Sequence, residues 1–179
     1  MANYAPSTRA RIADLITGMH VKTTDAGLGL TAFTNTAQTE LFTVVGRIAV
    51  VQLFIELTGT FDANATTIAF NCTFTTPTIA VNEMQADCGS LASLTQGVRA
   101  TFIGGAVAST LVITDSAGLT DVEAAGKIHI VGGETSTGAN YVGSIGMLTA
   151  GATQATTATA TGHLFYYPMS EGAYAEALV

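Results

Sequence analysis

Ionic side chains are scarce in this sequence. Charged residues make up 11% of its 179 residues, whereas an ordinary soluble domain carries about 25%. Six lysines and arginines stand against thirteen acids, which gives a net charge of −7. A nucleic-acid surface needs clustered cations to displace counterions, so this balance argues against one. With so few charges, much of the exterior must consist of neutral side chains or face neighbouring subunits.

The sequence also lacks a long apolar run and a recognisable export signal. Its densest apolar stretch, Ile48 to Leu57, is interrupted by Gln52 and Glu56, and a membrane-spanning helix needs about 20 apolar residues. The first residues, MANYAPSTRARIADL, contain no uninterrupted apolar core such as a signal peptide has. We therefore expect no membrane partner, and a protein kept in a cytoplasm or in a particle assembled there.

Cysteine is rare as well, with Cys72 and Cys88 the two in the chain. In a reducing compartment both are expected to be free thiols. Their spacing also allows a disulfide, so that alternative stays open.

Period-two alternation, which is typical of strands, recurs along the chain. The clearest run is Thr67–Phe74. One face holds Ile68, Phe70, Cys72 and Phe74, and the other holds Ala69, Asn71 and Thr73. Further strands are predicted at Ile48–Leu57, Ile79–Ala86, Val98–Ile103, Ser109–Thr114, Lys127–Val131, Tyr141–Leu148 and His163–Tyr167. Short strands at spacings of about ten residues, without long helical patterns between them, predict an all-β fold with an antiparallel β-sandwich or barrel.

The alternation also predicts which face of a strand is buried. In Ile48–Leu57 we expect the face that holds Ala49, Val51 and Leu53 to be apolar, and the opposite face to be half apolar. A strand covered in this way is central or buried on both sides. In Lys127–Val131 we expect Ile128 and Ile130 to point inward, with Lys127 and His129 outward. The turn Asp62–Ala65 is expected to join two strands as a hairpin.

One short helix is predicted near the N-terminus. Ser7 or Thr8 can cap it, and Ile12, Leu15, Ile16 and Met19 follow the i, i+3, i+4, i+7 spacing of an apolar face. So short a helix is marginal alone and needs a docking surface. Since residues 20–39 have the pattern of an extended polar connector, we divide the chain into an N-terminal arm, residues 1–39, and a β-sandwich body, residues 40–179.

Two glycine- and aspartate-containing segments match known ligand loops only in part. Gly133–Asn140 has the spacing of a phosphate loop, but Ala139 and Asn140 stand where a lysine and a hydroxyl residue would bind phosphate and magnesium. Asp115–Asp121 has too few alternating oxygen ligands for a calcium loop of the EF-hand type. We interpret Gly133–Asn140 as a hairpin turn and Asp115–Asp121 as a turn after the strand Ser109–Thr114.

The remaining candidates for catalysis or metal binding do not form a recognisable motif. His20, His129 and His163 lie too far apart in sequence for a local metal site, although the last two could approach each other in the fold. Ser144 lacks the first glycine of a nucleophile elbow. Scattered carboxylates such as Glu56, Glu83 and Glu134 could pair in space. We therefore expect no enzyme, no metal and no cofactor.

Interface residues are predicted at the two ends of the chain. The first twelve residues contain Arg9 and Arg11 and no acid, so they carry +2 and the remainder carries −9. A basic arm on an acidic body suits docking onto a neighbour. Tyrosines near the C-terminus can fill the core or anchor an interface, because they combine a large apolar ring with a polar tip. The candidate interface residues are Arg9, Arg11, Ile12, Leu15, Ile16, Tyr166, Tyr167 and Tyr174.

The layout resembles the virion structural proteins of tailed bacteriophages, especially the small β-rich capsid decoration or cement proteins. The segments that carry the resemblance are LFTVVGRIAVVQLFIELTGTFDANATTIAF, from Leu41 to Phe70, and GHLFYYPMSEGAYAEAL, from Gly162 to Leu178; together they cover about a quarter of the chain. The resemblance implies a β-sandwich or jelly roll, commonly a homotrimer seated where capsomers meet, with an N-terminal segment that contacts the shell. Residues 1–39 would take that role here.

The sequence thus leads to one main functional hypothesis and two alternatives. We expect a non-enzymatic virion protein that decorates or cements a phage capsid, with further copies of itself and the major capsid protein as partners. A tail, baseplate or fibre component is the first alternative. A carbohydrate-binding module or adhesin is the second, although the absence of tryptophan leaves few aromatic residues for stacking on sugars.

Overall fold

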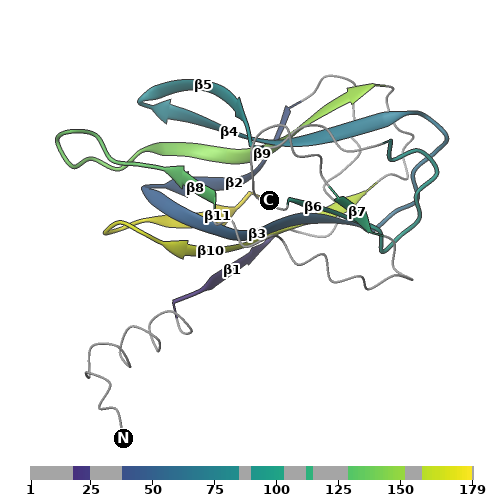
Figure 1. Ribbon diagram of the computed structural model, residues 1–179, viewed down its shortest axis with the longest axis horizontal. Coiled ribbons are helices and arrows are strands. Elements are labelled where there is room, and N and C mark those ends of the chain that lie inside the picture. Colours follow the sequence, from purple (N-terminus) through teal and green to yellow (C-terminus); the bar gives the residue numbers. More distant parts are fainter. Residues whose placement is uncertain are drawn as a thin grey trace, which may run out of the picture.

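The computed structural model describes residues 18–24, 38–84, 90–102, 112–114, 129–151 and 159–178. This part of the chain forms eleven strands in two antiparallel sheets that pack face to face (Figure 1). The predicted all-β sandwich is therefore confirmed. The predicted N-terminal helix lies outside the described residues, as do Cys88 and Asp115–Asp121.

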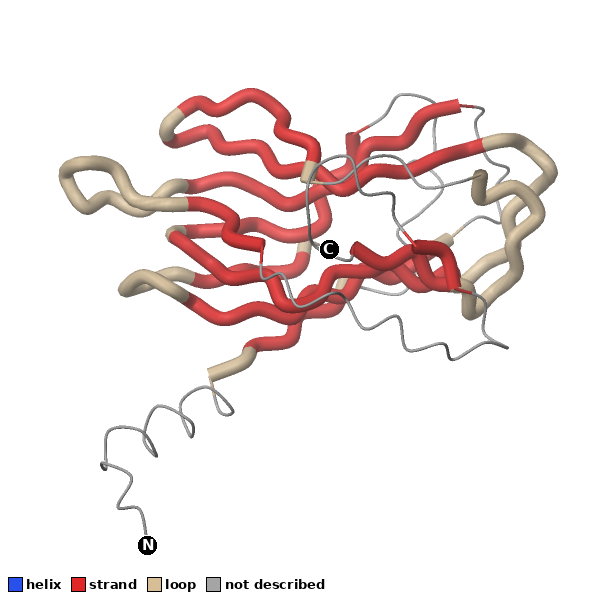
Figure 2. The backbone as a smooth tube through the Cα atoms, viewed as in Figure 1, coloured by secondary structure: helices blue, strands red, loops and turns tan. Residues whose placement is uncertain are grey.

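Each sheet combines strands from distant parts of the sequence. Sheet A has the order β1 (His20–Thr23), β10 (Ala160–Pro168), β3 (Arg47–Leu57), β6 (Arg99–Phe102) and β7 (Val112–Thr114), with β8 (His129–Gly132) also paired to β3. Sheet B has the order β11 (Tyr174–Ala177), β2 (Gln38–Val45), β9 (Val142–Gly151), β4 (Thr66–Thr76) and β5 (Thr78–Glu83). The strands run along the long axis of the body, and the turns gather at its two ends (Figure 2).

A single hydrophobic core fills the space between the sheets. Leu53 and Ile55 of β3 enter it from sheet A, and Ile68 and Phe70 of β4 enter it from sheet B, all of them without exposed surface. Burying a side chain of this size contributes about 1.5–3 kcal/mol. The alternation seen in Thr67–Phe74 thus faces the core as predicted.

A β-bulge in β3 overturns part of the predicted face assignment. The pairing with β10 passes from Gln52 opposite Phe165 directly to Val50 opposite Tyr166, so Val51 has no partner. An inserted residue of this kind reverses the phase of the alternation. Val51 is consequently 38% exposed, whereas Val50 and Ile48 join the core. The prediction that Val51 shares a face with Leu53 was wrong, but the central position of this strand is confirmed.

The predicted orientation of β8, which pairs with β3, was also wrong. Ile130 is 54% exposed, and Val131 enters the core instead. The pairing explains this, because Val131 lies opposite the buried Ile48 and Ile130 lies opposite Ala49 on the outer face. Two adjacent β-branched residues make either phase of this strand compatible with the sequence.

Several connections cross from one sheet to the other instead of forming hairpins within a sheet. The turn Asp62–Ala65 follows β3 in sheet A and precedes β4 in sheet B, so it crosses between sheets and joins no paired strands. Gly133–Asn140 also crosses between sheets, yet it forms the predicted turn, with the Thr135 N–H donating to the Ala139 carbonyl at 2.8 Å. β1 lies inside the predicted connector, so the boundary at residue 39 separates this strand from its sheet.

Gly46 makes the shortest of these crossings possible. It is the single residue between β2 in sheet B and β3 in sheet A, and its φ of +75° lies in the left-handed region that favours glycine. A Cβ at this position would lie 2.8 Å from both the Ala173 Cβ and the Ser170 Oγ. The chain can therefore change sheets here only without a side chain.

Candidate interaction surfaces

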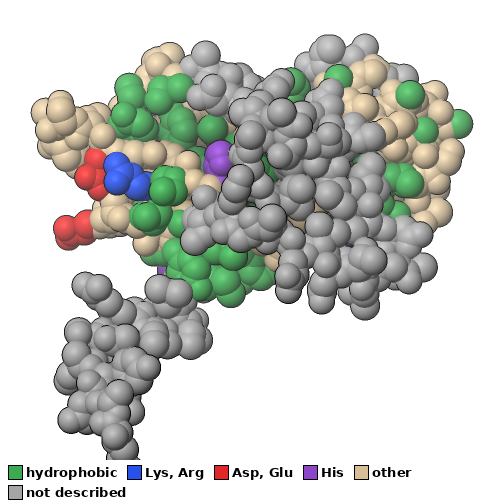
Figure 3. Space-filling model, in the orientation of Figure 1, with side chains coloured by type: hydrophobic (Ala, Val, Ile, Leu, Met, Phe, Trp, Pro, Cys, Tyr) green, Lys and Arg blue, Asp and Glu red, His purple; other side chains and the backbone are tan. Residues whose placement is uncertain are grey.

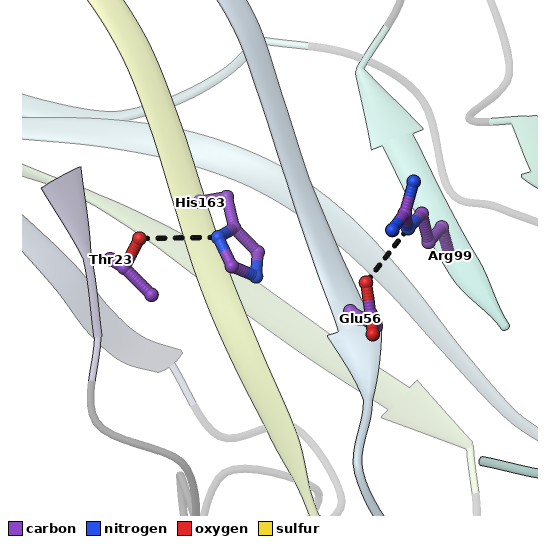
Figure 4. A network of polar contacts seen from close by, with 4 residues as sticks. All are labelled: Thr23, Glu56, Arg99 and His163. Atoms are coloured by element: carbon purple, nitrogen blue, oxygen red, sulfur yellow. Dashed lines mark hydrogen bonds and ion pairs between the residues drawn. The ribbon is translucent and has the colours of Figure 1, made fainter. Parts of the chain in front are cut away.

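Four strands of sheet A each contribute one side chain to a line of polar contacts on its outer face (Figure 4). The His163 Nδ1 lies 3.2 Å from the Thr23 Oγ1, which joins β10 to the edge strand β1. The Arg99 Nε donates to the Glu56 Oε2 at 2.8 Å, which joins β6 to β3. Each contact links two neighbouring strands, and the two pairs meet where β10 and β3 are joined by their backbone ladder.

Aromatic contacts surround the His163 imidazole. The ring stacks on Phe54 with 4.6 Å between centroids, and the Arg99 guanidinium lies 5.3 Å from the same Phe54 ring. Burial lowers the pKa of His163, the Glu56 carboxylate raises it and Arg99 lowers it again, with a net lowering. The imidazole is therefore neutral near pH 7.

This geometry does not form a catalytic constellation among the described residues. A threonine hydroxyl beside an imidazole could be a nucleophile and its base, but a carboxylate must then orient the imidazole. The Glu56 carboxylate instead bonds to Arg99. Ser144 donates from its Oγ to Glu40 Oε1 at 3.1 Å, so its hydroxyl contacts a carboxylate and no imidazole. Among the residues that the structure describes, no group of three potential metal ligands gathers.

The fold does not bring the histidines together. His163 lies opposite Phe54 of β3, whereas His129 lies opposite Val50 near the other end of that strand. The His129 ring makes an edge-on contact with Phe102, 5.3 Å between centroids, and burial lowers the pKa of His129. The third, His20, stacks on Tyr166 at the edge of sheet A. Each histidine is thus packed separately against an aromatic ring.

The tyrosines predicted as interface residues separate into two groups. Tyr166 is 1% exposed, and its hydroxyl contacts Ala175 of the opposite sheet, so it belongs to the core and cannot reach a partner. Tyr167 is half-buried on the outer face of sheet A, and Tyr174 is 43% exposed on the outer face of sheet B. The five arm residues predicted for the interface, Arg9, Arg11, Ile12, Leu15 and Ile16, lie outside the described residues.

Apolar side chains gather on the outer face of sheet A, in what we call the sheet A patch. It consists of Val21, Val51, Ile130, Phe165 and Tyr167, of which Val21 and Ile130 are about half exposed. The register places Val21 opposite Phe165, and Ala49 lies between Tyr167 and Ile130. Figure 3 shows hydrophobic side chains gathered over the lower part of the body, where β1 and β10 run in Figure 1. Neighbouring exposed apolar side chains of this kind make the sheet A patch a candidate interaction surface.

A smaller apolar group, the sheet B row, lies on the outer face of the other sheet. Tyr174 of β11 pairs with Val45 of β2, and Val45 pairs with Val142 of β9, so the three side chains form one line across three strands. Val142 is 39% exposed. Two residues beyond Tyr174, Glu176 points to the same face and is exposed. The row therefore ends beside a carboxylate.

Sequence reasoning missed most of these surface residues. Alternating valine and isoleucine gives the same pattern whether a face meets the core or a partner, so only the register identifies Ile130 and Val142 as external. The expected free thiol is found at Cys72, which is half-buried, and burial raises its pKa. In the described part of the chain, no helix has the length and apolar character needed to cross a membrane.

Comparisons with protein-family models, with curated proteins and with solved structures find no significant match to this chain.

Proposed function

We propose that this protein is a non-enzymatic structural component of a phage virion, which decorates or cements the capsid as a homotrimer. In this role the body supplies shape and apolar contact surface, and the N-terminal arm contacts the major capsid protein. A role of this kind needs many copies and little ionic chemistry, in keeping with the scarcity of charged residues.

The observation that carries the proposal is the apolar surface on the two outer faces of the sandwich. Ile130 and Val21 expose about half of their surface although each could have been a polar residue without disturbing the core. A free monomer with a net charge of −7 gains no solubility from these side chains. They are explained if neighbouring subunits or a shell cover them.

The arm is the second element of the proposal. β1 pairs with β10 as part of sheet A, so we assign the contact with the shell protein to residues 1–17. This segment contains Arg9 and Arg11, the two cations of the first twelve residues. Binding through many identical copies would add up by multivalency even if each arm contributes little.

Particle binding tests the proposal directly. We expect the full chain to co-purify with intact particles in a fixed ratio to the shell protein. Deleting residues 1–17, which spares β1, should abolish particle binding and leave a folded body. The double variant Arg9→Glu, Arg11→Glu should weaken binding, whereas Ala63→Asp, at an exposed loop position, serves as a charge control that should bind normally.

Other outcomes identify the alternatives. Recovery with isolated tails and not with heads would indicate a tail, baseplate or fibre component. Binding of the purified chain to soluble glycans, with no association with particles, would indicate an adhesin or a carbohydrate-binding module. Full particle binding by the deletion variant would contradict the role assigned to the arm.

A further inference from the structure

Charge is divided unequally between the two sheets. Among the residues that the structure describes, the strands of sheet A place Arg47, Arg99 and Glu56 on the outer face, a balance of +1, whereas Lys22 lies opposite the buried Leu164 on the inner side. The described strands of sheet B place the exposed Glu40 and Glu176 on the outer face and contain no cation, a balance of −2. Glu56 is already paired with Arg99. The sandwich is therefore polarised, with one mildly basic and one acidic face.

Each of these charged faces also carries an apolar group near the same end of the sandwich. On sheet A, Ala49 lies between Tyr167 and Ile130 on the neighbouring strands. The exposed Arg47 is two residues before Ala49 on the same strand. On sheet B, the row of Tyr174, Val45 and Val142 ends beside Glu176. Only Gly46 separates Val45 from Arg47, so the two groups lie back to back on opposite faces.

We infer that the sheet A patch of one copy docks on the sheet B row of the next copy, in a head-to-tail contact. This inference deepens the proposed function, because it rests on the oligomer proposed there and specifies its interface. Contact between unlike faces covers both apolar groups and brings Arg47 toward the acidic Glu176 side. Contact between two sheet B faces would oppose like charges, and contact between two sheet A faces would leave the row of Tyr174 uncovered.

The symmetry of the assembly follows from this contact. A contact between two different surfaces is heterologous, and it generates a closed ring when the rotation between copies closes. Patches on opposite faces at one end of a sandwich suit such a ring, and three copies would form the proposed trimer. A contact between two identical surfaces would instead stop at a dimer.

The test compares two single variants of the full chain. Ile130→Asp places a charge in the sheet A patch, and Tyr174→Asp places one in the sheet B row; both positions are about half exposed, so folding should be kept. Ala63→Asp adds the same charge at an exposed loop position near the opposite end of β3. Circular dichroism and thermal melting check each fold, and Ile130→Thr and Tyr174→Ser replace any aspartate variant that melts early.

Sedimentation measures the assembly. The unmodified chain and Ala63→Asp should form the same closed oligomer. For Ile130→Asp alone and for Tyr174→Asp alone, the protein concentration at which half of the oligomer dissociates should rise roughly tenfold or more, as for loss of an interface hot spot. A one-to-one mixture of the two patch variants should form a dimer and nothing larger. In that dimer the intact row of the Ile130→Asp copy contacts the intact patch of the Tyr174→Asp copy.

Three results would overturn the inference: normal assembly of Tyr174→Asp with loss of assembly in Ile130→Asp, a mixture that stays monomeric, or an unmodified chain that is monomeric at all concentrations. These failures are separable from failure of the proposed function. A chain that assembles head to tail but ignores particles keeps the inference and loses the function. A chain that binds particles, but whose variants show that copies contact each other through identical surfaces, keeps the proposed function and loses the inference.

Discussion

The Tyr166 hydroxyl is a polar link between the two sheets, and removing it gives a quantitative test of the fold. Tyr166 belongs to β10 in sheet A, and its hydroxyl accepts from the Ala175 N–H at 2.9 Å and donates to the Ala175 carbonyl at 3.3 Å. Ala175 belongs to β11, the edge strand of sheet B, and has no exposed surface. The hydroxyl thus satisfies backbone groups that neither water nor β2 reaches.

Tyr166→Phe keeps the ring and removes only the hydroxyl, so little packing is lost. It leaves the buried Ala175 N–H without its partner, which costs about 1–3 kcal/mol. In a protein of 150–250 residues each 1 kcal/mol corresponds to about 2–4 °C in Tm. We therefore expect Tm to fall by about 2–12 °C. Urea titration should show the corresponding loss of about 1–3 kcal/mol in the free energy of unfolding, with an unchanged m value.

Tyr167→Phe provides the matched control. This neighbouring tyrosine is half-buried on the outer face, so its loss of a hydroxyl should change the free energy of unfolding by less than about 0.5 kcal/mol. If Tyr166→Phe were as stable as the unmodified chain, or no less stable than Tyr167→Phe, the proposed link between the sheets would be refuted.

Three further predictions follow from burial and charge. Phe70→Asp should lose more than about 4 kcal/mol and leave the chain unfolded at 37 °C, because it places an unpaired carboxylate in the core; a cooperative melt near that of the unmodified chain would show that this face is not buried. The lowered pKa values of His163 and His129 mean that the unfolded chain binds more protons, so stability should fall as pH drops below about 6.5, the ordinary histidine pKa; melting at pH 5 to 8 measures this, and His163→Gln should flatten the slope. Because burial raises the pKa of Cys72, its thiol should react with iodoacetamide more slowly in the folded protein than after denaturation at pH 7.5, measured in a Cys88→Ser background; equal rates would contradict the observed burial.

Residues 47–57 show how far the alternation could predict the fold. The pattern correctly gave a central strand with Leu53, Ile55 and Leu57 on one face. It could not reveal the bulge at Val51, because valine suits either face of a sheet and the bulge exists only as a mismatch between β3 and β10. The same ambiguity affected β8, where only pairing with Ile48 shows that Val131 is internal.

Three strands, β1, β2 and β11, were not among those predicted, and two of them, β1 and β11, are only four residues long. His20–Thr23 contains too few residues for a periodic pattern, and its structure depends on pairing with β10, which lies some 140 residues away in sequence. Tyr174–Ala177 is equally short, and it is fixed by its pairing with β2 and by the Tyr166 hydroxyl. The local preference of a residue for strand structure does not depend on partners that lie so far away in the sequence.

The amino-acid sequence by itself determined the class of the fold, because alternation at period two and short spacing between turns are local properties of the chain. It also determined that the surface would be poor in charge. Only the tertiary structure decided which apolar residues face solvent, which sheet each strand joins, and that Tyr166 is internal while Tyr174 is external. The physical reason is that each of these depends on register between distant strands, where a shift of one residue exchanges the buried and exposed faces.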